Sequence, residues 1–271
     1  MILLNGQWQG GADKVTLVGL EEIKKFYLEK NAYEEVQIDE EEALVNEAGI
    51  IGLTSIKKQT MQAWKILQEK RPSKLFTVGG GCDADVASIA YLNQLYQGDL
   101  CVLWFDAHGD INSPEESETH LFYGMPVRAL LGDCGEALSE TVPLKLKPDQ
   151  ILQIGGRAFD IAEAEYIKAQ NILHIGHDSV TFTETIMDAV KKTGKQHCYI
   201  HLDLDVLDPR EFPYVPVPEA GGVALEELKK SMVAIAEKCN LVGFGLYEYA
   251  PQEQVIPAMD WFVKYGMMVA D

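Results

Sequence analysis

Two short motifs in this 271-residue chain carry side chains that could bind metal ions together. LWFDAHGD places Asp106, His108 and Asp110 at alternating positions after an apolar run, and HLDLDVLDP places Asp203 and Asp205 in the same way. Alternate residues of an extended chain point to one side. We therefore expect these side chains to converge where two strands end.

Convergence of these carboxylates requires a cation. Two unit charges about 4 Å apart repel by roughly 4 kcal/mol at an effective dielectric near 20. Divalent metal removes this repulsion: carboxylate and imidazole ligands together suit Mn, Fe, Zn or Ni, and two ions roughly 3.5–4 Å apart generate a hydroxide nucleophile at neutral pH. The alternative is that each aspartate caps a helix or a turn, but two such motifs in one chain favour metal.

The elements that must position these motifs alternate along the chain. Short apolar runs between helical patterns predict an α/β fold with a parallel sheet. The expected strands are residues 75–78, 100–105, 150–154, 172–175, 197–204 and 241–247. The expected helices are residues 40–70, 84–96, 160–170, 181–194, 224–239 and 252–266, with Glu40 to Glu42 as a solvated helix start. Long loops at 106–124 and 208–222 follow predicted strands, where ligands bind in such sheets.

Composition narrows the possible partners. The chain has 42 acidic and 23 basic residues, a formal net charge of −19, so we expect neither nucleic acid nor an anionic membrane surface as a partner. Hydrophobic residues make up 47% of the chain and charged residues 24%. These values are typical of a globular protein, and we expect residues 1–271 to form a single domain.

The sequence also predicts a cytoplasmic protein. It contains no apolar run of roughly 20 residues, and its first residues do not have the pattern of a secretory signal. The five cysteines are scattered and form no CxxC pair, which fits a reducing compartment and no disulfide framework.

Three segments resemble the motifs of the ureohydrolase superfamily, which includes arginases, agmatinases and formimidoylglutamases. VGGGCDAD is similar to its Gly-Gly-Asp-His segment, DAHGDIN to its Asp-Ala-His-x-Asp motif and LDLDVLDP to its Asp-x-Asp-x-x-Asp-Pro motif. The stretch DAHGDINSPEESETHLFYGMPV most resembles arginases. The resemblance implies a three-layer α/β/α sandwich, two manganese ions at the carboxyl edge of the sheet, and a homo-oligomer, either trimer or hexamer.

The resemblance also implies roles for individual residues. The metal ligands would be Cys82, Asp106, His108, Asp110, Asp203 and Asp205. Asp110 would also orient a metal-bridging hydroxide that attacks the guanidino carbon, and Glu248 would bind the substrate's guanidinium by charge-assisted hydrogen bonds. The residues expected to hold the amino-acid end of the substrate are Asn112, Ser117, Thr119 and Asp160.

Several positions depart from the family pattern. Cys82 replaces a histidine ligand, and because thiolate suits Zn, Fe, Co or Ni better than Mn, we expect one ion to be weak, absent or replaced. Tyr123 replaces the histidine that acts as a proton shuttle, although a phenol near pKa 10 is a poor shuttle at neutral pH. Pro216 and Val217 stand where Gly and Thr are usual. His201 stands where arginases carry serine, and could be a partner of a ligand, a compensating ligand or a packed core residue.

Two functions remain open from the sequence. The first is a metal-dependent hydrolase that cleaves a linear C–N bond in an arginine-like or agmatine-like substrate, with Asp110, Glu248 and Tyr123 as catalytic candidates. The second is a catalytically impaired arginase-like protein that binds a ligand or acts as a scaffold. Five of the six ligand positions and Glu248 fit the pattern, so we favour the enzyme.

Overall fold

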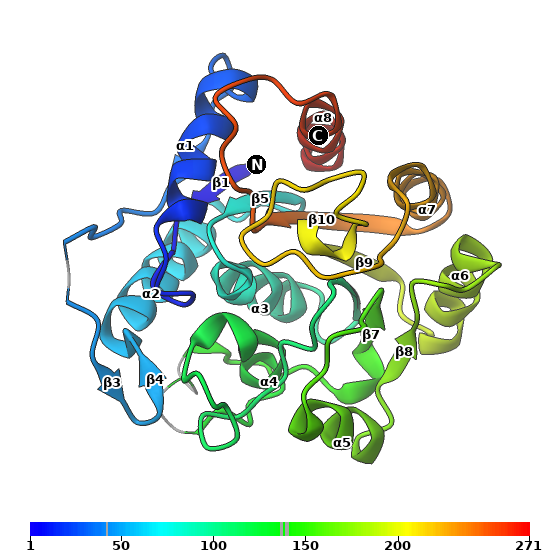
Figure 1. Cartoon of the computed structure of the whole chain (residues 1–271), viewed down its shortest axis with the longest axis horizontal. Helices are drawn as coiled ribbons and strands as arrows, with labels where there is room; N and C mark the ends of the chain where they lie inside the picture. Colours follow the sequence, from blue (N-terminus) through cyan, green and yellow to red (C-terminus); the bar gives the residue numbers. More distant parts are fainter. Residues whose placement is uncertain (42, 136–137, 139–140) are drawn as a thin grey trace.

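The computed structural model describes residues 1–41, 43–135, 138 and 141–271. Within these residues, eight parallel strands form a central sheet in the order β2-β1-β5-β10-β9-β6-β7-β8 (Figure 1). They are β1 (Ile2–Asn5), β2 (Glu34–Glu35), β5 (Leu75–Gly79), β6 (Leu100–Phe105), β7 (Ile151–Ile154), β8 (Leu173–Ile175), β9 (His197–Asp203) and β10 (Asn240–Tyr247). A separate antiparallel pair consists of β3 (Asn46–Glu47) and β4 (Ile50–Ile51). The predicted fold class is confirmed.

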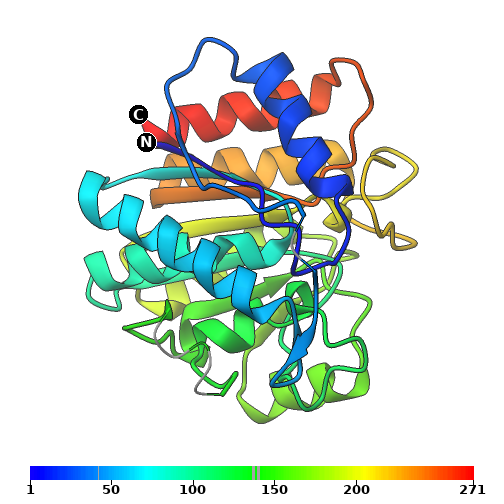
Figure 2. The same ribbon diagram turned by 90° about the vertical axis from the view of Figure 1, so that its left-hand side faces the viewer.

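Helices cover both faces of the sheet and complete three layers (Figure 2). One face is covered by α1 (Val15–Tyr27), α6 (Phe182–Thr193), α7 (Leu225–Lys238) and α8 (Pro257–Ala270), and the other by α2 (Leu53–Lys70), α3 (Val86–Leu95), α4 (Pro126–Leu130) and α5 (Ile161–Ala169). Neighbouring strand residues such as Val102 and Leu103 enter opposite cores, because successive side chains alternate across a sheet. Of the helices described, none is both long and apolar enough to cross a bilayer.

The predicted helix over residues 40–70 is wrong in its first part, because α2 begins at Leu53. The preceding residues form β3 and β4, which are joined through Gly49 with a φ of 81°. Gly52, with a φ of 73°, ends the turn, so left-handed glycines interrupt the helical pattern. Glu40 and Glu41 of the predicted helix start are not helical, and Glu42 lies outside the described residues.

The other predicted elements agree with the structure to within a few residues, apart from the last helix. It was expected over residues 252–266, whereas α8 runs from Pro257 to Ala270. Proline at the first helical position fixes this start, because its backbone angle suits a helix and its missing N–H needs no partner there. The sequence patterns did not predict β1 and α1.

The strands β5, β10, β9 and β6 are neighbours at the centre of the sheet. Tyr247 of β10 pairs with Asp203 of β9, and Leu202 of β9 pairs with Phe105 of β6. The carboxyl ends of these parallel strands therefore meet at one edge of the sheet, where ligands bind in open α/β folds.

Candidate metal centre and active site

Each of the four central strands delivers site residues where it ends. Cys82 begins a short 3-10 helix after β5, Asp106 directly follows β6, Asp203 is the last residue of β9, and Glu248 directly follows β10. The neighbouring strands thus bring together segments that are more than 160 residues apart in the chain, as the 3.3 Å hydrogen bond from Cys82 N to Glu248 Oε1 shows.

Tight turns, rather than extended chain, aim the carboxylates. Asp106 accepts a hydrogen bond from His108 N at 2.6 Å, and Asp203 accepts one from Asp205 N at 2.7 Å. Asp110 and Glu248 have left-handed backbones, with φ values of 53° and 59°. The predicted alternation along an extended chain beyond Asp106 is therefore wrong, although the side chains do converge. The sequence offered turn capping and metal binding as alternatives for these aspartates, but Asp106 and Asp203 both cap turns and belong to the candidate metal groups.

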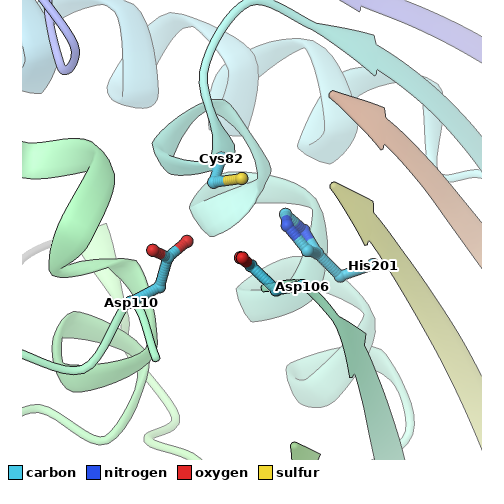
Figure 3. Close-up of side chains that lie close together, drawn as sticks. All are labelled: Cys82, Asp106, Asp110 and His201. Atoms are coloured by element: carbon cyan, nitrogen blue, oxygen red, sulfur yellow. The ribbon is translucent and has the colours of Figure 1, made fainter. Parts of the chain in front are cut away.

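The converging side chains form three groups that share members, and within each group the candidate ligand atoms all lie within 4.8 Å of one another. These groups are Cys82, Asp106, Asp110 and His201; Cys82, Asp203 and Glu248; and Asp106, His108 and Asp205. Figure 3 shows the first group, with its four side chains pointing toward a common centre. All six ligands expected from the sequence belong to these groups, and His201 and Glu248 join them.

Burial and mutual repulsion disfavour ionisation of this cluster. Burial raises the pKa of Asp110 and of Asp203 well above the usual range, and neighbouring carboxylates raise it further. The pKa of the Cys82 thiol is raised by burial and by Asp203, to which its Sγ donates a hydrogen bond at 3.1 Å. Burial also acts on Asp106, but hydrogen bonds from His108 outweigh it and hold the pKa of Asp106 below its ordinary value. A bound cation would stabilise the ionised forms.

The donor set fits divalent metal ions. Asp110 Oδ2 and His201 Nε2 are buried and have no hydrogen-bond partner among the described residues, whereas buried polar groups normally find one. Carboxylate, imidazole and thiolate are all ligands of transition metals. An ion between these residues would satisfy both atoms and remove the repulsion between the carboxylates.

A cavity of about 140 Å³ opens onto the cluster. Its lining includes His108, Asp110, Asp203, Asp205, Glu248 and Tyr123, and also the loop residues Pro216 and Val217. Burial raises the pKa of Tyr123, and the nearby Asp110 and Glu248 carboxylates raise it further, so its phenol stays protonated near neutral pH. Burial similarly raises the pKa of Glu248 well above its usual range, with Asp83 adding to the effect.

The four residues expected at the amino-acid end of the substrate are not part of the lining of this cavity. Asn112 Nδ2 donates to Asp160 Oδ2 at 2.7 Å, which joins two of them. Ser117 and Thr119 bind their own loop: their hydroxyls accept hydrogen bonds from the backbone N–H groups of His120 and Leu121. Their role in substrate binding stays a prediction.

Sequence reasoning missed three features of the site. The N-terminal segment contributes Gly11, Asp13, Val15 and Thr16 to the cavity wall. The buried Asp85 contacts His201, with His201 Nδ1 and Asp85 Oδ2 2.8 Å apart. Arg157 donates to the carbonyl of Asp205 at 2.7 Å and to that of Glu219 at 3.1 Å, and so connects the 208–222 loop to the turn that carries Asp205. Of these three features, only Asp85 could have been suspected from the sequence, because it is an acidic residue in the VGGGCDAD segment.

The sequence profile of the arginase family matches residues 17–257. The chain belongs to the arginase family. The arginase of Staphylococcus aureus (strain MRSA252) is 29% identical over 180 residues, which cover 64% of this chain and 59% of that protein. The arginase of Bacillus subtilis (strain 168) is 29% identical over 239 residues, which cover 86% of this chain and 76% of that relative. The match thus spans less than two thirds of the S. aureus protein.

The fold of this arginase-family protein is similar to that of a solved arginase structure. The arginase of Entamoeba histolytica, determined in complex with L-ornithine, superposes with a TM-score of 0.85 at 19% identity, covering 99% of this chain and 96% of that one. The resemblance expected from the three sequence motifs is confirmed.

Proposed function

We propose that this protein is a metal-dependent hydrolase that cleaves a linear C–N bond in a guanidino substrate. The observation that carries the proposal is the acidic cavity: Asp110, Asp203, Asp205 and Glu248 line it together. Such a cavity attracts cations, both metal ions and a guanidinium group, and the family membership of the chain supports this chemistry.

Different residues have separate roles in the proposed reaction. Asp106, His108, Asp110, Asp203 and Asp205 would hold divalent metal at the strand ends, and such metal would supply a nucleophilic hydroxide by lowering the pKa of bound water. Asp110 Oδ2, which has no partner among the described residues, would orient that nucleophile and accept its proton once a bound cation keeps the carboxylate ionised. Glu248 is held by Cys82 N at 3.3 Å and binds the guanidinium by charge-assisted hydrogen bonds.

The metal is manganese in the simplest form of the proposal, but Cys82 makes the centre asymmetric. The group that holds Asp106, His108 and Asp205 offers nitrogen and oxygen donors suited to Mn²⁺, whereas the groups that include Cys82 offer a sulfur donor. We also propose a homo-oligomer, a trimer or hexamer, which light scattering on the purified protein would measure.

A urea-release screen tests the proposed activity. Arginine, agmatine and guanidinobutyrate are each incubated with the protein loaded with Mn, Ni, Co or Fe in turn. We expect turnover of at least one substrate, and Glu248→Gln should raise the KM for that substrate while leaving the metal content unchanged. No turnover in any combination would contradict the proposal.

A second function has a specific observation in its favour. Tyr123, Pro216 and Val217 line the same cavity, and each departs from the pattern that arginases use near the reaction. A non-catalytic protein that binds a guanidino ligand would show saturable heat of binding by calorimetry with every metal tested but no urea release.

A further inference from the structure

His201 is held in one orientation at the floor of the metal cluster. Its side chain is fully buried. Its ring stacks on Trp104, with ring centroids 3.5 Å apart and ring planes 6° apart, and on Tyr247, with centroids 4.8 Å apart and planes 13° apart. His201 Nδ1 lies 2.8 Å from Asp85 Oδ2. Two parallel aromatic rings and one hydrogen bond therefore fix both the plane of the imidazole and its rotation within that plane.

The hydrogen bond to Asp85 also decides which ring nitrogen can bind a metal. Tyr199 OH donates to Asp85 Oδ1, so this carboxylate acts as an acceptor at both of its oxygens. A neutral imidazole that donates Nδ1–H to Asp85 keeps its lone pair on Nε2. Metal-bound histidines commonly have this arrangement, with the other ring nitrogen donating to a carboxylate.

Nε2 of His201 has no hydrogen-bond partner in the described chain and is buried. The imidazole lies in the group with Cys82, Asp106 and Asp110, whose ligand atoms are within 4.8 Å of one another (Figure 3). A lone pair that faces carboxylates and a sulfur is repelled unless a cation lies between them. An unsatisfied buried acceptor already costs about 1–3 kcal/mol.

The distances suit a four-coordinate ion. Zn²⁺ binds thiolate sulfur at about 2.3 Å and imidazole nitrogen or carboxylate oxygen at about 2.0–2.2 Å, which places tetrahedral ligands roughly 3.5 Å apart. Ligand atoms separated by up to 4.8 Å would approach one another by at most about 1.3 Å, a movement within the reach of side-chain rotation.

We propose that His201 Nε2 is a metal ligand and that it completes, with Cys82, Asp106 and Asp110, a four-ligand site for a borderline-soft ion such as Zn²⁺ or Co²⁺. Asp85 is the positioning residue that fixes the ring and its tautomer. His201 on β9, which is separated from β5 by β10, thus supplies the nitrogen donor that is missing at Cys82. This inference deepens the proposed function by assigning one metal position, but it rests on metal binding and not on turnover.

The direct test uses the whole protein without any substitution. The chain has six histidines, so nitrogen-15 resonances of their rings can be resolved and assigned. Stripped protein is titrated with Zn²⁺, and the Nε2 resonance of His201 should move to the position of a metal-bound imidazole at one equivalent. If that resonance stays unchanged while Zn²⁺ binds elsewhere, or if both ring nitrogens stay protonated as in an ion pair with Asp85, the proposal is overturned.

Variants provide a second measurement. Co²⁺ titration of the wild type should produce a thiolate-to-cobalt absorption band from Cys82. His201→Phe, which keeps the stacking, should weaken Co²⁺ binding at this site by more than about 100-fold, and Asp85→Asn by about 10–100-fold. The matched control is His197→Phe: His197 is the first residue of the same strand, at the end away from Asp203, and stacks on Tyr96.

The outcomes separate this inference from the proposed function. Wild-type Co²⁺ affinity in a folded His201→Phe protein overturns the inference, even if the protein releases urea. A shift of the His201 resonance together with no turnover of any guanidino compound supports the inference and contradicts the proposed hydrolase. His197→Phe should bind Co²⁺ as the wild type does, and a loss there equal to that of His201→Phe would also overturn the inference.

Discussion

Arg157 connects the fold to the site, and its replacement should affect both. Its guanidinium donates to six backbone carbonyls of the described chain, at distances of 2.7–3.4 Å. They belong to Gly155, Asp205, Val206, Leu207, Glu219 and Ala220. One side chain thus fastens the end of β7, the turn that carries Asp205, and the last part of the 208–222 loop.

The magnitude follows from the three shortest contacts. The carbonyls of Asp205, Glu219 and Ala220 lie 2.7, 3.1 and 3.2 Å from the nitrogens of Arg157. A hydrogen bond from a charged donor contributes about 1.5–3 kcal/mol. Arg157 is only half-buried, so water can replace part of each contact, and about 1 kcal/mol for each is a better value. Arg157→Met should therefore lower the free energy of unfolding by about 3 kcal/mol.

Urea denaturation followed by tryptophan fluorescence measures this change, because the free energy of unfolding falls linearly with urea concentration. Arg157→Lys should recover only part of the loss, since an ammonium group cannot span several carbonyls as the planar guanidinium does. The matched control is Arg210→Met in the same loop: Arg210 is exposed and pairs with Asp208, so its loss should leave stability unchanged.

Arg157→Met should also weaken metal binding, because the turn that holds Asp205 loses its main anchor. Isothermal titration with Mn²⁺ should show a lower affinity for Arg157→Met than for Arg210→Met. The reasoning is refuted if Arg157→Met unfolds within about 0.5 kcal/mol of the wild type and binds Mn²⁺ with the same affinity.

Three further predictions concern packing, pH and metal choice. Gly19→Ala places a Cβ 1.9 Å from the carbonyl oxygen of Tyr249, so thermal melting should show a free energy of unfolding lower by roughly 1–3 kcal/mol. In the control Gly124→Ala, no atom of the described chain beyond the adjacent residues lies within 4 Å of the new Cβ, and this variant should melt like the wild type. Burial raises the pKa of Glu163 from 4.5 to about 7. The free energy of unfolding of the wild type, relative to that of Glu163→Gln, is therefore highest below pH 4.5. It falls by at most about 3 kcal/mol as the pH rises through about 7. Equal differences between the urea midpoints of the two proteins at pH 4.5 and pH 7.5 would contradict this. Cys82→His should raise Mn occupancy, as measured by metal analysis after Mn²⁺ incubation, and an unchanged occupancy would exclude Cys82 as a ligand.

The sequence predicted the strands of the sheet centre well, because burial on both faces makes each of them a continuous apolar run. LCVLWF of β6 is buried at every position, and such runs are typical of parallel sheets covered by helices. The region before α2 was predicted poorly. Its helical pattern is interrupted by left-handed glycines, and the energy of a turn depends on backbone angles that hydrophobic periodicity does not report.

For the site too, some residues could be predicted from local sequence and others could not. Local motifs predicted that Asp106, Asp110 and Asp203 converge, because each motif places its carboxylates near the end of a strand, and the structure brings them together. His201 remained open between a ligand and a packed core residue. Its role depends on Asp85, which is 116 residues away in the chain, and no local pattern links the two.

The sequence by itself determined the alternation of strands and helices, the acidic strand ends and the family to which they belong. These properties are encoded in short stretches, since apolar period and residue type act locally. Only the tertiary structure decided that β5, β10, β9 and β6 are neighbours, that His201 lies in one group with Cys82, Asp106 and Asp110, and that Arg157 holds the turn of Asp205. Each of these contacts joins segments far apart in the chain, and the order and register of the sheet set which side chains meet.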